Sequence, residues 1–155
     1  MQRADENTIT ADVLVVGGGL VGLTLALALA RSGLEVLVVD RETPASSTRP
    51  SFDGRVSSVA AGSVNLLRSL GVWNMLCNRA QPICQIRVSD RNSPRFLHYD
   101  SDDLDGGPMG YIVENQLLRA SLHSVVGAED RIIWRTGTSI QDLQLTPYAG
   151  SLVLS

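Results

Sequence analysis

The feature that most constrains this chain is a glycine-rich segment, residues 17–22, that separates two apolar stretches. Before it, residues 12–16 form a β-branched apolar run, which predicts a short strand buried on both faces. After it, residues 20–32 are rich in Leu and Ala, which favour a helix, and Gly33 stands where a C-terminal cap belongs. Residues 34–39 predict a second buried strand. This order predicts a βαβ unit with parallel strands.

The glycines of this segment match the GxGxxG fingerprint of dinucleotide-binding folds. Gly17 allows a tight turn, Gly19 lets the backbone approach a pyrophosphate, and Gly22 lets the helix pack closely on the strand. Asp40 ends the second strand, where a carboxylate can accept two hydrogen bonds from a ribose diol. The backbone N–H groups expected to face the phosphates belong to Gly19, Leu20 and Val21. The segment therefore predicts a dinucleotide site, and both NAD and FAD fit it.

Composition and charge exclude several other classes of protein. The formal net charge of −3 and the scattered arginines argue against a nucleic-acid surface. The two cysteines and two histidines show no metal-ligand spacing, so we expect no metal site. The uncharged run from Val13 to Ala30 is interrupted by the glycines, and the residues before it are acidic. We therefore expect neither a membrane span nor an export signal, and a cytoplasmic protein.

The rest of the chain continues as a mixture of helices and strands. Helices are predicted from about Ser58 to Leu70 and from about Glu114 to Val126, each followed by glycine. A hairpin is predicted where residues 85–90 and 96–99 flank a polar turn. Further short strands are predicted at residues 111–113, 132–134, 140–145 and 152–154. The predicted fold class is α/β.

Two stretches give the chain a family resemblance. Gly18 between the fingerprint glycines makes Gly-Gly-Gly, which resembles the N-terminal motif of the glutathione-reductase-like flavoproteins and favours FAD. Residues 52–63, Phe-Asp-Gly-Arg-Val-Ser-Ser-Val-Ala-Ala-Gly-Ser, are followed by Leu-Leu-Arg-Ser-Leu-Gly-Val-Trp at residues 66–73. Together they resemble the second block of the ubiquinone-biosynthesis hydroxylases, which are class A flavin monooxygenases with the para-hydroxybenzoate hydroxylase fold. The resemblance implies a Rossmann-like FAD-binding βαβ domain.

The resemblance also suggests roles for residues outside the fingerprint. Arg55, in the Asp-x-Arg of the second block, would reach the flavin cofactor, although an ion pair with Asp53 or another acid is an alternative. Residues 110–122 resemble a block in which the start of a helix lies along the FAD ribityl and pyrophosphate in relatives. Glu114 stands at a polar contact position of that block, although capping of the following helix is an alternative. Ile140 matches a position where relatives hold the adenine by main chain. Arg41, after Asp40, completes the cofactor-binding candidates.

The resemblance extends to domain organisation. Residues 1–10 are expected to be a polar tail, and residues 11–155 the N-terminal part of a discontinuous FAD-binding domain. Within it, residues 83–113 are expected to begin a mixed or antiparallel substrate sheet. Relatives continue with an Asp-Gly and a Gly-Asp motif, and the chain ends at Ser155 before either. We therefore expect an incomplete domain that is inactive alone.

The implied activity is hydroxylation of a phenolic ring, with NAD(P)H as electron donor and O₂ as co-substrate. A polyprenyl phenol of ubiquinone biosynthesis is the implied substrate, which places the protein at the inner membrane surface with peripheral contact to the membrane or to a biosynthetic assembly. No catalytic side chain is expected in these residues, because they supply cofactor affinity. Two alternatives remain open: the Rossmann domain of an NAD(P)-dependent dehydrogenase, and a non-catalytic nucleotide-binding fragment.

Overall fold

The computed structural model describes residues 9–44, 54–91, 94–104, 107–147 and 149–155. The chain divides into two compact units. The first unit combines Met1–Thr48 with Leu122–Ser155, and the second comprises Arg49–Ser121. Each unit has its own strands and its own apolar core, so each is described by itself.

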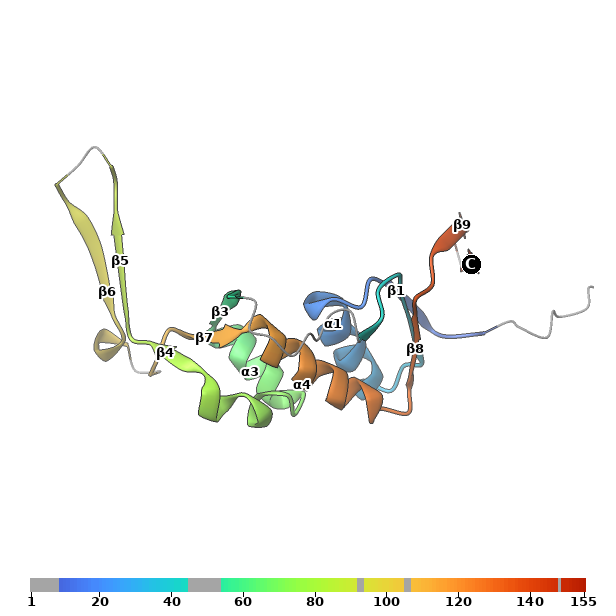
Figure 1. The fold of residues 1–155 in the computed structure, drawn as a ribbon, viewed down its shortest axis with the longest axis horizontal. Helices are drawn as coiled ribbons and strands as arrows, with labels where there is room; N and C mark the ends of the chain where they lie inside the picture. The colour runs from blue at the N-terminus through green and yellow to red at the C-terminus, as the bar shows by residue number, and fades with distance from the viewer. Residues whose placement is uncertain (1–8, 45–53, 92–93, 105–106, 148) are drawn as a thin grey trace, which may run out of the picture. The chain divides into compact units, whose positions relative to one another are not determined.

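The first unit is built on a parallel three-stranded sheet in the order β1-β2-β8, of which Figure 1 labels the two outer strands, β1 and β8. Helix α1 (Leu20–Arg31) connects β1 to β2 and packs against all three strands. The side chains of Val36, Val38 and Val39 in β2 are nearly inaccessible because β2 is the central strand. The predicted βαβ unit with parallel strands is confirmed. The three strands are β1 (Val13–Val16), β2 (Val36–Asp40) and β8 (Ile132–Thr136).

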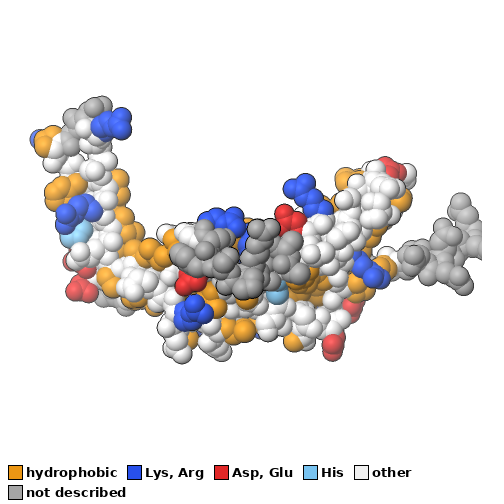
Figure 2. Space-filling view, in the orientation of Figure 1, with side chains coloured by type: hydrophobic (Ala, Val, Ile, Leu, Met, Phe, Trp, Pro, Cys, Tyr) orange, Lys and Arg blue, Asp and Glu red, His pale blue; other side chains and the backbone are white. Residues whose placement is uncertain are grey.

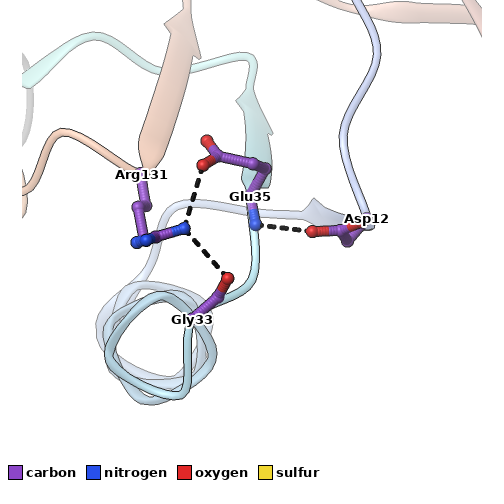
Figure 3. A network of polar contacts seen from close by, with 4 residues as sticks. All are labelled: Asp12, Gly33, Glu35 and Arg131. Carbon is purple, nitrogen blue, oxygen red and sulfur yellow. Dashed lines mark hydrogen bonds and ion pairs between the residues drawn. The ribbon is translucent and has the colours of Figure 1, made fainter.

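A polar network holds the amino ends of these strands together (Figure 3). Arg131, just before β8, donates from Nη1 to the carbonyl of Gly33 at 3.0 Å and to Glu35 Oε1 at 3.1 Å. The backbone N–H of Glu35, just before β2, donates to Asp12 Oδ2 at 2.8 Å. Gly33 has φ +96°, so it reverses the chain after α1 in a conformation that favours glycine. This network lies at the amino ends of the strands, whereas the glycine fingerprint follows the carboxyl end of β1.

Beyond β8, the chain forms an antiparallel hairpin. Its strands are β9 (Ile140–Leu145) and β10 (Gly150–Leu154), paired with a register shift between Val153 and Leu154. The three strands predicted in this part of the sequence are therefore confirmed. The connection between β8 and β9 stays close to the end of β2, because the N–H of Thr138 donates to the carbonyl of Asp40 at 3.0 Å.

The second unit contains an antiparallel sheet in the order β3-β7-β4. Trp73 is 4% exposed and meets the ring of Tyr111 edge to face, with centroids 4.9 Å apart, so it belongs to the core of this unit. Helix α4 (Asn115–Gly127) follows β7 directly. Apart from the hairpin described below, the other elements of this unit are β3 (Val56–Ala60), α3 (Ala61–Ser69), β4 (Gln81–Ile83), β7 (Gly110–Glu114) and the 3₁₀ turns Trp73–Met75, Cys77–Arg79 and Ser101–Asp103.

The helix predicted from about Ser58 begins later than expected. Residues 56–60 form β3, which pairs with β7 from Val56 opposite Glu114 to Ala60 opposite Gly110. A side chain at Gly110 would come within 2.5 Å of the carbonyl of Val59, so β7 approaches β3 unusually closely there. Long-range pairing with β7 therefore overrides the local helical pattern, and α3 starts at Ala61.

The predicted hairpin is confirmed as β5 (Gln85–Ser89) paired antiparallel with β6 (Phe96–Asp100). Its apolar side chains are exposed along the hairpin in Figure 2, and Phe96 and Leu97 are 54% and 61% accessible. Arg87 lies over the ring of Phe96, 4.9 Å from its centroid.

Among the helices of the described residues, none combines the length and the apolar character needed to cross a membrane.

Candidate dinucleotide-binding site

The turn between β1 and α1 has the geometry that the fingerprint predicts. Gly17 has φ +104°, and its N–H donates to the carbonyl of Val39 at 2.8 Å. A Cβ at Gly22 would lie 1.9 Å from the carbonyl oxygen of Gly17. No side chain fits at Gly22 between α1 and the turn, whereas Gly17 is favoured by its positive φ, which residues with a side chain rarely adopt.

Gly19 is the N-cap of α1, and the space around it is open. A Cβ built at Gly19 would meet no atom within 4 Å, and no side chain caps this helix end. The first N–H groups of a helix have no acceptor within the helix, and they point away from its N-terminus. The side chain of Val21, in the first turn, is 84% exposed. This open end of α1, with its N–H groups and its positive dipole end, is suited to a phosphate.

Asp40, the last residue of β2, lies against the fingerprint. Its Oδ2 accepts the N–H of Gly18 at 2.6 Å, and its Oδ1 accepts the N–H of Glu42 at 2.8 Å. Each carboxylate oxygen has a further lone pair, so Asp40 keeps the capacity to accept donors from a ligand. The sequence predicted Asp40 at this sheet edge, and the structure brings it into direct contact with the glycine segment.

Trp134 is a neighbour of this site that the sequence did not indicate. Its Nε1 is buried without a hydrogen-bond partner in the described structure. A Cβ at Gly18 would lie 2.8 Å from this nitrogen and 2.9 Å from Asp40 Oδ2. The ring of His123 meets the indole edge to face, with centroids 4.9 Å apart. Only the pairing of β2 with β8 brings Trp134 here, and no local sequence pattern reports that pairing.

Two other candidates of the first unit lie after β2 and β8. Arg41 follows Asp40 and is exposed. Ile140 opens β9, is partly buried and pairs with Leu154 of β10. The hydrogen bond from Thr138 to the carbonyl of Asp40, 3.0 Å long, keeps the approach to β9 beside the end of β2.

In the second unit, the structure brings Arg55 and Glu114 together. The N–H of Asn115, the first residue of α4, donates to the carbonyl of Arg55 at 3.1 Å, and Ser57 Oγ lies 2.5 Å from Asn115 Oδ1. Glu114 Oε1 lies 3.5 Å from Nη2 of Arg79. Asp53, the alternative partner of Arg55, lies outside the described residues. Sequence reasoning missed Arg79 and Asn115, because the first stands in an irregular segment and the second is a common helix-start residue.

The residues of the first unit fit the adenosine diphosphate half of a dinucleotide such as FAD. The open space at Gly19 is where a phosphate would approach, and any side chain there would fill it. Asp40 supplies acceptors at the end of the adjacent strand. The fit rests on this geometry of the glycine turn and the carboxylate.

The family of the chain follows from comparison with known proteins. Residues 10–124 match the FAD binding domain family. The chain is 50% identical over 117 residues to ubiquinone hydroxylase UbiL of Rhodospirillum rubrum, covering 76% of this chain and 27% of that protein. It is 33% identical over 131 residues to 3-demethoxyubiquinol 3-hydroxylase of Escherichia coli, covering 83% of this chain and 33% of that protein.

A solved structure shows the same fold. The aklavinone-11 hydroxylase crystallised with FAD and aklavinone matches with a TM-score of 0.64 and 26% identity, over 96% of this chain and 30% of that one. The chain thus spans about a third or less of the length of each of these proteins. The glycine turn, the fold and the family match lead to one conclusion: the chain belongs to the FAD-binding domain family.

Proposed function

We propose that the chain forms the part of an FAD site that holds the adenosine diphosphate half, in a monooxygenase that hydroxylates a phenolic ring. The observation that carries the proposal is the β1–α1 turn, where a side chain at Gly22 would collide with the carbonyl of Gly17 while Gly19 faces open space. The 50% identity to a ubiquinone hydroxylase supports the reaction class. A polyprenyl phenol of ubiquinone biosynthesis is the proposed substrate.

The residues of the first unit divide the work of binding. Gly17 and Gly22 fix the turn, so that the N–H groups of Gly19, Leu20 and Val21 face the pyrophosphate. Asp40 accepts hydrogen bonds from the hydroxyl groups of the adenosine ribose. Arg41 contributes positive charge beside it, and Ile140 offers main-chain contact to the adenine.

We also propose that two residues of the second unit, Arg55 and Glu114, contact the cofactor. Arg55 places a guanidinium toward the cofactor, and the hydrogen bond between its carbonyl and Asn115 fixes its backbone at the start of α4. Glu114 accepts hydrogen bonds from the ribityl hydroxyls. The nearby Arg79, with Nη2 3.5 Å from Glu114 Oε1, offsets part of the negative charge of that carboxylate.

Bound FAD supplies the redox chemistry by which O₂ is activated and one oxygen atom is transferred to the phenol, with NAD(P)H as the electron donor. These residues bind and orient the cofactor, and we assign none of them a catalytic role. We also propose that the β5–β6 hairpin begins the substrate sheet, and that residues 11–155 are one portion of a discontinuous FAD-binding domain. A polyprenyl substrate would bring the protein to the inner membrane surface as a peripheral protein.

The test compares one substitution at two glycines of the first unit. Gly19→Val places a branched side chain where the pyrophosphate would lie, whereas Gly127→Val adds the same atoms at the end of α4, also with no atom within 4 Å. We expect Gly19→Val to abolish FAD binding, followed by flavin fluorescence quenching, with far-UV circular dichroism unchanged. Gly127→Val should bind as the wild type does. Retained binding by Gly19→Val would refute the phosphate assignment.

A second candidate function is that of an NAD(P)-dependent dehydrogenase. The observation that favours it is Asp40, because an acid at the end of the second strand also binds the ribose of NAD. Flavin absorbance of the purified protein in the visible range would exclude this candidate. Tight binding of NAD without any binding of FAD would establish it.

A further inference from the structure

The indole N–H of Trp134 is a buried donor that the fold does not use. Its nitrogen is shielded from solvent and has no hydrogen-bond partner in the described residues. A buried donor without an acceptor destabilises a protein, and such groups in native structures call for an explanation. Trp134 lies in β8, opposite Val38, two residues before the position opposite Asp40. The unused donor is therefore beside the carboxyl end of β2.

The surroundings of Gly18 place this donor next to the Asp40 carboxylate. The position that a Cβ of Gly18 would occupy is 2.8 Å from Trp134 Nε1 and 2.9 Å from Asp40 Oδ2. The two polar atoms therefore flank the same point on the middle glycine of the turn. The ring of His123 also contacts the indole edge to face, with centroids 4.9 Å apart. The GxGxxG pattern leaves the middle position unspecified, but here any residue larger than glycine would press on both side chains.

We infer that Trp134 is a positioning residue for the ribose-binding carboxylate, with its Nε1–H donating to Asp40 when a dinucleotide is bound. This inference rests on the proposed function. In the structure described here, Oδ2 accepts from Gly18 and Oδ1 accepts from Glu42. A ribose diol brings two more O–H donors for the remaining lone pairs of the carboxylate, and we expect the carboxylate to turn toward them. The indole N–H is the neighbouring donor that holds the turned carboxylate in place.

The first experiment is a double-mutant cycle of Trp134→Phe and Asp40→Asn, with FAD and ADP titrated against the protein. Trp134→Phe alone should raise both dissociation constants about fivefold, the effect of one hydrogen bond to a charged or polar partner. In the Asp40→Asn background, the same substitution should change them by less than about twofold, because Trp134 acts through the carboxylate. Equal losses in the two backgrounds would show that Trp134 contributes packing alone, and would overturn the inference.

A second measurement separates the N–H group from the size of the ring. Replacing Trp134 by benzothienylalanine keeps a bicyclic ring and removes the N–H, and we expect the same fivefold loss as with phenylalanine. Binding within twofold of the wild type would overturn the inference even if Trp134→Phe proved unstable. The indole ¹H–¹⁵N signal of Trp134 should also shift when ADP is added, while that of Trp73 should stay. A wild-type protein that binds neither FAD nor ADP would instead refute the proposed function.

Discussion

Gly22→Ala should damage both the fold and cofactor binding of the first unit. The added Cβ would lie 1.9 Å from the carbonyl oxygen of Gly17 and 3.0 Å from its carbon. Because ordinary contacts begin at 3.4 Å, the helix and the turn would have to separate by about 1.5 Å. Backbone atoms cannot yield as a flexible side chain can, and overpacking typically costs 1–3 kcal/mol. We expect the free energy of unfolding to fall by about 3 kcal/mol, the upper end of that range.

The matched control is Gly19→Ala, three residues earlier in the same turn. Its Cβ would meet no atom within 4 Å, so the free energy of unfolding should change by less than about 1 kcal/mol. It should nevertheless weaken FAD binding, because the methyl group enters the space assigned to the pyrophosphate. Urea denaturation followed by circular dichroism measures stability, and flavin fluorescence measures binding. A Gly22→Ala variant as stable as Gly19→Ala would refute the close-packing argument.

Three further predictions concern other parts of the molecule. Asp40→Ala should weaken FAD binding by about 1.5–3 kcal/mol, roughly ten- to a hundred-fold in titration, and a change below twofold would show that the carboxylate faces solvent. The N–H of Asp102, then the Gln85 side chain, lower the pKa of Asp100 below its ordinary 3.8. The stability that Asp100 gives the hairpin should therefore be fully present above pH about 3.8 and be lost as the pH falls through the lowered pKa. Amide hydrogen exchange of the hairpin measures this stability, and Asp100→Asn should abolish its pH dependence. The 155-residue chain matches 27% of its Rhodospirillum relative, so we expect it to bind FAD weakly and to form no hydroxylated product when FAD, NAD(P)H and a phenol are added. Chromatography measures the product, and product formation coupled to NAD(P)H consumption would show that the chain contains a complete active site.

The βαβ unit could be predicted because its signals are local. A β-branched run, a glycine turn and a Leu- and Ala-rich segment each report on their own neighbourhood, and α1 begins at Leu20 as expected. The hairpin of β5 and β6 was predictable for the same reason, since two strands flank a polar turn. Asp40 lies near Gly18 because β1 and β2 are parallel, so that the carboxyl ends of the two strands lie side by side.

The parts that could not be predicted depend on contacts between distant segments. The local pattern predicts a helix from about Ser58, over the second part of β3, because the pairing partner of β3, strand β7, lies about fifty residues further along the chain. The position of Trp134 depends on the pairing of β8 with β2, so its sequence context indicates only a buried strand residue. The pairing of Arg79 with Glu114 arises in the same way. Sequence patterns locate elements, but the partners that complete a site are set by the tertiary arrangement.

Competition between ligands tests whether the site binds the adenosine diphosphate half of FAD. The protein is titrated with FAD, and the bound flavin is then challenged with ADP, FMN or NAD at equal concentrations. In the proposed site the glycine turn and Asp40 bind the adenosine diphosphate half, so ADP should displace FAD and FMN should not. Displacement by FMN as effective as that by ADP, or tight binding of NAD with no binding of FAD, would contradict the account.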